Sequence, residues 1–122
     1  MGENYNYNKQ NSARKQMHYS PNLLSCITNA IDNCKLATIE YDSREKGITV
    51  RDIEPMALVY KDRKRHIAGW CRLRNEYRSF RLDRLNTIKV LNEEFARRQD
   101  FNLNDFQDNN PVPVDEEEES ED

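Results

Sequence analysis

Two short strand-like patterns separated by a polar break occupy residues 63–85, and they limit what the chain can fold into. Side chains alternate with a period of two over residues 67–74 and again over residues 77–82. Successive side chains of a β-strand point to opposite faces of the sheet, so this period predicts two strands. Asn75 and Glu76 interrupt the apolar pattern as a short hairpin connection would. The centre of the chain is therefore expected to be a β-hairpin.

The predicted hairpin is strongly basic. Residues 61–84 contain nine Lys or Arg and three Asp or Glu, which gives a local charge of +6, and they include the only Trp. Guanidinium groups match the geometry of phosphates and carboxylates, and aromatic faces can stack on nucleic-acid bases. Arginines interleaved with aromatic residues on neighbouring strands therefore indicate an anion-binding surface. The alternative is an ordinary solvated sheet face whose Lys and Arg protect its edges.

One helix and several further strands are predicted on either side of this hairpin. Residues 21–34 have the apolar repeat of an amphipathic helix, with Leu23, Ile27, Ala30, Ile31 and Cys34 forming one buried stripe. Alternation predicts strands at residues 36–41, 48–54, 56–60 and 87–91. Pro55 is expected to end or bend the second of these, because proline cannot donate to a sheet ladder. Residues 92–98 are expected to form at least one helical turn.

A leading helix followed by five or six short strands predicts a mainly β fold with one N-terminal helix (α+β). Short strands in a small chain favour a curled sheet or open barrel, since closure leaves few raw edges. The helix stripe is expected to pack on the sheet together with Val50, Ile53, Leu58, Ile67, Phe80, Leu82, Leu85 and Ile88.

Both ends of the chain differ in composition from residues 21–98, which are expected to form the single domain. Residues 1–20 are polar without apolar periodicity, and residues 99–122 contain ten acidic and no basic side chains, so both are predicted to be disordered. The whole chain has a net charge of −3, whereas residues 1–98 carry +7. The acidic tail either competes for the basic surface as an internal mimic of nucleic acid or only increases solubility. No segment is apolar and long enough to span a membrane or to resemble a secretory signal, which predicts a cytoplasmic protein.

The remaining chemistry gives no support for an enzyme, a metal or a cofactor. Cys26, Cys34 and Cys71 are an odd number without close spacing, so they are expected to be small buried side chains and not a disulfide framework or a zinc site. His18 and His66 are far apart in sequence, and the three glycines form no phosphate-binding loop. No catalytic residue, metal ligand or cofactor is predicted.

Three segments resemble the WYL domain family. Residues 78–85, Arg-Ser-Phe-Arg-Leu-Asp-Arg-Leu, match the most specific element of that family, Arg-x-Phe-Arg-x-Asp-Arg-Ile. Residues 68–74 and 51–59 match two weaker elements, and the resemblance extends from about residue 23 to residue 95. The chain departs from the family at the Trp-Tyr-Leu triplet that names it, where Arg65, His66 and Ile67 stand instead.

The resemblance implies a five- or six-stranded barrel of the Sm or SH3-like type, packed by the helix. It also implies a ligand-sensing module of the kind found mostly in bacterial and phage-related proteins, often behind a DNA-binding winged helix-turn-helix. About twenty residues before the helix are too few for such a DNA-binding domain, so a stand-alone module or truncated regulator is expected. Asp83 could pair with an arginine and position it. The ligand contacts carried over by position are Arg51, His66 at the Tyr position, Arg78, Phe80, Arg81 and Arg84.

The basic surface and the resemblance together predict a regulatory module in bacterial transcription or defence. Its expected ligand is single-stranded nucleic acid or a nucleotide-like effector. The alternative is a protein-interaction adaptor that dimerises or docks on a separate transcription factor without a nucleic-acid ligand. A salt-insensitive complex with another protein would favour the adaptor. An unrecognised hydrolase is a third class, but it needs a pocket with a perturbed acid–base pair, and the sequence gives none.

Overall fold

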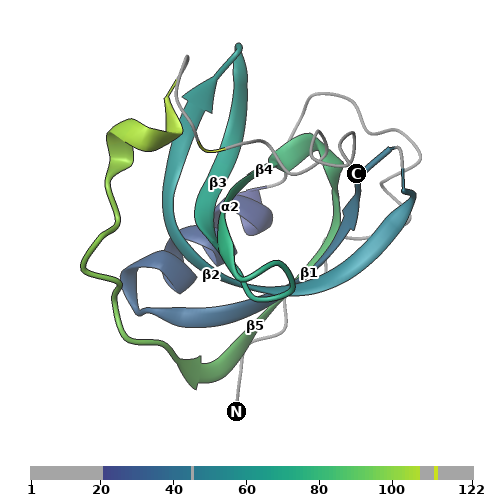
Figure 1. The fold of residues 1–122 in the computed structure, drawn as a ribbon. Coiled ribbons are helices and arrows are strands. Elements are labelled where there is room, and N and C mark those ends of the chain that lie inside the picture. Colours follow the sequence, from purple (N-terminus) through teal and green to yellow (C-terminus); the bar gives the residue numbers. More distant parts are fainter. Residues whose placement is uncertain (1–20, 45, 108–111, 113–122) are drawn as a thin grey trace.

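A computed structural model describes residues 21–44, 46–107 and 112 (Figure 1). The predicted N-terminal arm and most of the predicted acidic tail lie outside these residues. One α-helix is followed by five strands and two short 3-10 helices. In chain order they are α2 (Pro21–Asp32), β1 (Lys35–Asp42), β2 (Ile48–Lys61), β3 (Lys64–Cys71), β4 (Glu76–Arg81), η1 (Leu82–Arg84), β5 (Leu85–Glu94) and η2 (Leu103–Phe106).

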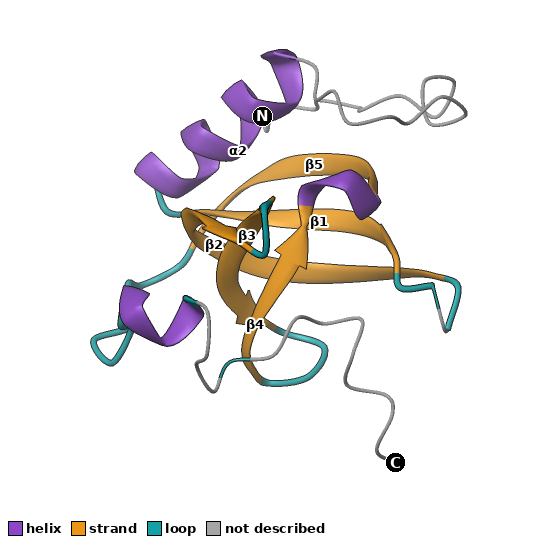
Figure 2. Cartoon of the chain, turned by 90° about the horizontal axis from the view of Figure 1, so that it is seen from above, coloured by secondary structure: helices purple, strands orange, loops and turns teal. Residues whose placement is uncertain are grey.

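The five strands form one antiparallel, strongly curled sheet in the order β4-β3-β2-β1-β5. Figure 2 shows α2 lying over this sheet, where it contacts β1, β2 and β5. The expected mainly β fold with one leading helix is therefore confirmed. The barrel of the Sm or SH3-like type implied by the resemblance is not confirmed, because β4 and β5 are the two edges of the sheet and do not pair with each other in the described structure.

Pro55 was expected to end or bend its strand; it does not end it, since β2 continues through it to Lys61. Pairing between β2 and β1 stops at Ile53, so the missing N–H of Pro55 removes no bond on that side. On the other side Pro55 lies opposite Gly69, and the register shifts by one residue before Ala57. Gly69 allows the two backbones to approach, because a Cβ there would collide with the carbonyl group of Glu54. This bulge bends β2 so that one strand serves two partners.

The main hydrophobic core lies between α2 and one face of the sheet. The helix stripe is confirmed for Leu23, Ile27 and Ala30, which are buried, while Ile31 is partly buried. Val50 was expected in the core, but its side chain is 62% exposed. Successive residues of a strand point to opposite faces, and its neighbour Arg51 points inward and is buried. Cys26 and Cys71 are buried, and none of the three cysteines forms a disulfide. The other expected sheet residues are in the core or, for Leu58, packed against it: Ile53, Leu58, Ile67, Phe80, Leu82, Leu85 and Ile88.

A second apolar cluster lies on the opposite face of β2, β3 and β4, here called the outer face. Its buried members are Val59, Ala68 and Phe106, with Tyr77 and Phe101 packed against them. Figure 2 shows η2 and α2 on opposite sides of the sheet. Residues 95–107, here called the C-terminal strap, therefore cover the outer face.

The strap corrects two expectations. Residues 92–94 continue β5 and no helix follows at 95–98, so the predicted helical turn is absent from this described segment. The domain boundary expected after residue 98 does not coincide with the end of packed structure, because Phe106 is 1% exposed. Within the described residues, no helix has the length and apolarity that crossing a membrane requires.

Candidate functional site

The structure places the six predicted ligand contacts in two groups, one on the core-facing side of the strands and one away from it. Arg51, Arg78 and Phe80 are on the core-facing side of their strands, and all three are buried. His66 and Arg81 are opposite one another on β3 and β4. Arg84 follows in η1 and is half-buried. The predicted set is therefore not one continuous surface.

Arg51 is held inside the molecule by polar and aromatic contacts. Its Nη2 donates to Thr49 Oγ1 at 2.6 Å, and its Nη1 lies 3.9 Å from Cys71 Sγ. Its guanidinium carbon is 6.0 Å from the ring centroids of both Tyr41 and Phe80, which is the limit of cation–π attraction. Phe80 itself is fully buried, so it is a core residue that contacts Arg51 from within.

Arg78 forms an ion pair on its own strand. Its Nε donates to Glu76 Oε2 at 2.9 Å, and its Nη2 contacts the same oxygen. It lies opposite Gly69, on the other face of β4 from Arg81. The structure therefore does not bring Arg78 and Arg81 together as one anion site.

Arg81 is oriented by a bidentate contact with Asp83. Its Nε and Nη2 donate to the two carboxylate oxygens at 3.0 and 2.8 Å. Burial works to raise the pKa of Asp83, but the hydrogen bonds from Arg81 and the charges of Arg81, Lys64 and Arg84 outweigh it and lower that pKa. The carboxylate stays ionised and fixes the guanidinium. The expected pairing of Asp83 with an arginine is confirmed.

His66 is 2% exposed and carries no charge at neutral pH. Burial, together with the positive charges of Lys61 and Arg81, lowers its pKa from 6.5 to about 4. Its Nδ1 lies 3.0 Å from the Lys64 carbonyl oxygen, and the neutral ring donates through that nitrogen. His66 therefore contributes shape and hydrogen bonding here, and not positive charge.

Two lysines that were not among the predicted contacts complete the surface group. Lys61 and Lys64 are partners at the closing end of the β2–β3 hairpin, and the turn residues Asp62 and Arg63 adopt φ values of 56° and 64°. Both lysines belong to the basic stretch of residues 61–84, so the charge of that stretch was their signal in the sequence. We define the basic end of the outer face as Lys61, Lys64 and Arg81, with His66 and Asp83 beside them.

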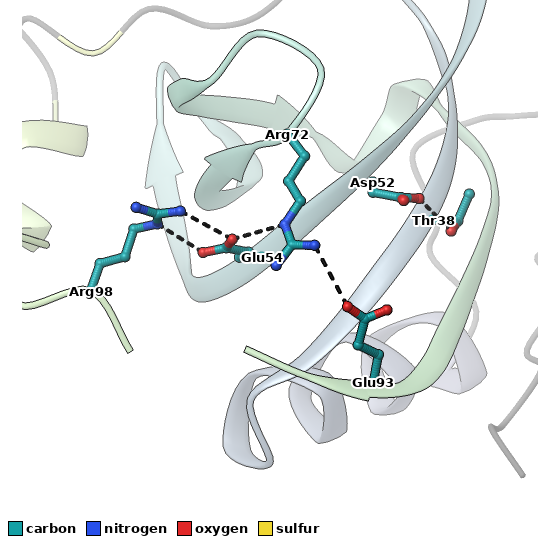
Figure 3. A network of polar contacts seen from close by, with 6 residues as sticks. All are labelled: Thr38, Asp52, Glu54, Arg72, Glu93 and Arg98. Atoms are coloured by element: carbon teal, nitrogen blue, oxygen red, sulfur yellow. Dashed lines mark hydrogen bonds and ion pairs between the residues drawn. The ribbon is translucent and has the colours of Figure 1, made fainter. Parts of the chain in front are cut away.

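The opposite end of the outer face carries a polar network centred on the buried Glu54, drawn in Figure 3. Glu54 is 2% exposed and accepts from Arg72 Nε at 3.0 Å and from Arg98 Nε at 2.8 Å. The Arg98 guanidinium also stacks on the Trp70 ring, with its carbon 3.7 Å from the ring centroid. These contacts hold the strap on the sheet. Arg72, which contributes to the sequence charge of the basic stretch, is therefore engaged in a structural ion pair.

An open depression of about 280 Å³ lies beside this network. It is lined by Val50, Arg51, Asp52, Arg72 and Leu73. Val50 and Leu73 are 62% and 59% exposed, so the depression has an apolar rim. The described residues contain no group of three or more His, Cys, Asp or Glu that could hold a metal ion.

Comparisons with known proteins agree with this architecture. The model of the WYL domain family matches residues 22–90, which is more than half of the chain. The chain is 31% identical over 72 residues to YobV of Bacillus subtilis strain 168, described as an uncharacterised HTH-type transcriptional regulator. That match covers 59% of this chain and 23% of the regulator.

Among solved structures, proteasome accessory factor B/C (PafBC) of Arthrobacter aurescens has a similar fold, with a TM-score of 0.59 and 24% identity. This match covers 70% of the present chain and 15% of PafBC. The chain thus spans less than a quarter of the length of either protein. From the family match and the shared fold, we conclude that this chain belongs to the WYL domain family.

Proposed function

We propose that the chain is a ligand-sensing regulatory module that binds single-stranded nucleic acid or a nucleotide-like anion at the basic end. The observation that carries this proposal is the convergence of Lys61, Lys64 and Arg81 on one face, with Asp83 fixing the Arg81 guanidinium. An oriented guanidinium flanked by flexible ammonium groups suits the oxygen atoms of a phosphate. Membership of the family and similarity to a transcriptional regulator support a role in bacterial transcriptional or defence regulation.

We further infer that the module acts by binding and not by catalysis. The displaced pKa values among the described residues each have a structural cause: burial for His66 and Tyr77, and ion pairing for Asp83 and Arg98. None of these groups lines the open depression. A module that regulates transcription works beside the DNA, so we expect a cytoplasmic location.

The proposal is tested by anisotropy titrations of a labelled oligothymidylate and an oligouridylate at two salt concentrations. Three cations at the basic end can neutralise up to about three phosphates, so the slope of log affinity against log salt should reach about −2 for a single strand. An Arg65→Ala variant is the control, because Arg65 is exposed and alternates to the other face of β3. No binding of either oligonucleotide at low salt contradicts the proposal.

The apolar rim of the depression favours a second candidate function, a protein-interaction or dimerisation adaptor. Ile48, Val50 and Leu73 are more than half exposed. Exposed apolar side chains gathered in one place mark contact sites for other proteins. Sedimentation of the purified chain over a range of concentrations tests this function. A dimer that persists at high salt and is lost in Leu73→Ser supports the adaptor, and a salt-independent monomer argues against it.

A further inference from the structure

The C-terminal strap follows a defined path along the outer face. Figure 1 shows it running from the end of β5 along β2 toward the β2–β3 hairpin. It is anchored first by Arg98 on Glu54 and Trp70. The Tyr77 hydroxyl then donates to Asp100 at 2.6 Å, and the rings of Tyr77 and Phe106 meet edge to face at 5.8 Å. The strap thus leads the chain from the Glu54 network toward the basic end.

The contacts of Val112, the next described residue after the strap, show where the chain lies beyond residue 107. Its carbonyl oxygen accepts from Lys61 Nζ at 3.5 Å, and its side chain packs against the apolar cluster of the outer face. Lys61 belongs to the basic end, so the backbone at residue 112 lies beside the proposed anion site. Two unrelated contacts, one polar and one apolar, agree on this placement.

The sequence beyond Val112 is complementary in charge to the basic end. Seven of the last eight residues, 115–122, are acidic. Asp115 is three residues after Val112, and three residues of chain span at most about 11 Å. The length of chain from Val112 therefore allows the first tail carboxylate to reach Lys61 and Lys64. A segment tethered this closely has an effective concentration in the millimolar range.

We propose that residues 115–122 bind the basic end and act as an internal competitor of its anionic ligand. The contact itself rests on the path of the strap and on charge. Its regulatory consequence rests on the proposed function, because competition requires a ligand at the same cations. Arg78 lies on the other face of β4 and is paired with Glu76, so it is not part of the surface that the tail is proposed to bind.

The contact is tested by amide NMR spectra of the full chain and of a variant whose seven tail carboxylates are changed to amides (Asp→Asn and Glu→Gln at 115–119, 121 and 122). At low salt the two spectra should differ at Lys61, Lys64, His66 and Arg81. They should agree at residues of the buried core, and the differences should shrink at high salt because exposed charges are screened over about 8 Å at physiological ionic strength. Differences that avoid the basic end overturn the proposal.

Two charge-reversal variants at neighbouring positions distinguish a tail contact at the basic end from general electrostatic attraction to the domain. Lys64→Glu and Arg65→Glu change the net charge equally, but residues 64 and 65 alternate between the two faces of β3. Lys64→Glu should abolish most of the tail-dependent shifts, whereas Arg65→Glu should retain them. Equal loss in both variants shows that net charge alone is responsible and overturns the proposal.

Competition is measured separately with labelled oligothymidylate on the same two full-length proteins. Neutralising the tail should tighten binding by about tenfold at low salt. Tail-dependent shifts without binding to either protein contradict the proposed nucleic-acid function and leave the tail contact in place. Equal binding to both proteins without shifts at the basic end overturns the tail contact and leaves the proposed function in place.

Discussion

Arg81 and His66 are neighbours across β3 and β4, yet they contribute different chemistry. Arg81 is a charged donor oriented by Asp83, while His66 is neutral because burial lowers its pKa to about 4. Alternation in the sequence predicted the strand that carries Arg81 and put Arg81 and Arg78 on opposite faces of it. It could not show that Arg51 and Arg78 occupy inward positions, because a period of two tells which residues share a face but not which face is covered.

Replacing Arg81 with Ala should weaken oligonucleotide binding by about 1–3 kcal/mol, the range for a charge-assisted hydrogen bond. Thermal stability should change little, because the Arg81 backbone N–H that donates to the Tyr41 hydroxyl at 3.0 Å is retained. Anisotropy and thermal unfolding of Arg81→Ala, with Arg65→Ala beside it, check both expectations. A collapsed melting temperature with normal binding by the folded fraction assigns Arg81 a structural role instead.

His66 should make the protein less stable in mild acid. Its folded pKa of about 4 is below the ordinary 6.5, so between these values the unfolded chain binds a proton that the folded chain does not. Stability is therefore fully retained above about pH 6.5 and falls as the pH decreases toward 4. Urea unfolding at about pH 7 and about pH 5 measures the loss.

The His66→Asn variant is the comparison for this prediction. Asparagine keeps a donor near the Lys64 carbonyl but does not titrate. The variant should lose less stability than the wild type between the same two pH values. An identical loss in both proteins assigns the acid sensitivity to other groups.

At the scale of elements, the helix and the strand positions followed from apolar periodicity, and the errors came from interactions between strands. The sequence marks Pro55 as a breaker, but nothing local reveals that its neighbour across the sheet is Gly69. The turn after β3 was expected at Asn75 and Glu76, whereas Glu76 already begins β4 and Asn75 adopts a left-handed φ of 59°. Pairing between neighbouring strands set these boundaries, and the sequence of one strand alone does not show which residues of another strand it pairs with.

Gly69→Ala should destabilise the sheet by about 1–3 kcal/mol, the usual range for overpacking. The added Cβ meets the backbone of Glu54 and Pro55, which cannot rotate away as a side chain would. Gly47→Ala is the matched control: a Cβ there meets no atom, but its φ of +81° strains any larger residue by about 1 kcal/mol. Urea unfolding should rank Gly69→Ala as the less stable variant, and the reverse order contradicts the bulge as the reason for glycine.

At the scale of the whole molecule, the folded unit is longer than composition indicates. Residues 99–107 belong to the acid-rich segment, yet Phe101 and Phe106 pack on the outer face. In the sequence, the two aromatic residues among polar neighbours were the available signal of packing, but the acidic charge of residues 99–122 predicted disorder instead. The family model ends at residue 90, so the strap lies outside the part of the chain that it describes.

Truncation tests this extended boundary. A chain ending after residue 98 loses the buried Phe106 and the partly buried Phe101; full burial of a Phe is worth about 1.5–3 kcal/mol, so unfolding should become easier by up to about 6 kcal/mol. A chain ending after residue 112 keeps both rings and Val112, and at high salt, where the proposed tail contact is screened, it should match the stability of the full chain. Denaturant midpoints for the three proteins measure the difference. Equal midpoints show that the strap adds no stability.

The stacking of Arg98 on Trp70 also has a practical consequence. Trp70 is the only tryptophan in the sequence, and the strap covers it through a guanidinium 3.7 Å from its ring. Indole emission shifts to longer wavelength when water reaches the ring, so the native protein contains its own optical reporter. Rapid-mixing measurements of that emission would follow the strap leaving and returning in unlabelled protein, in real time and without any substitution.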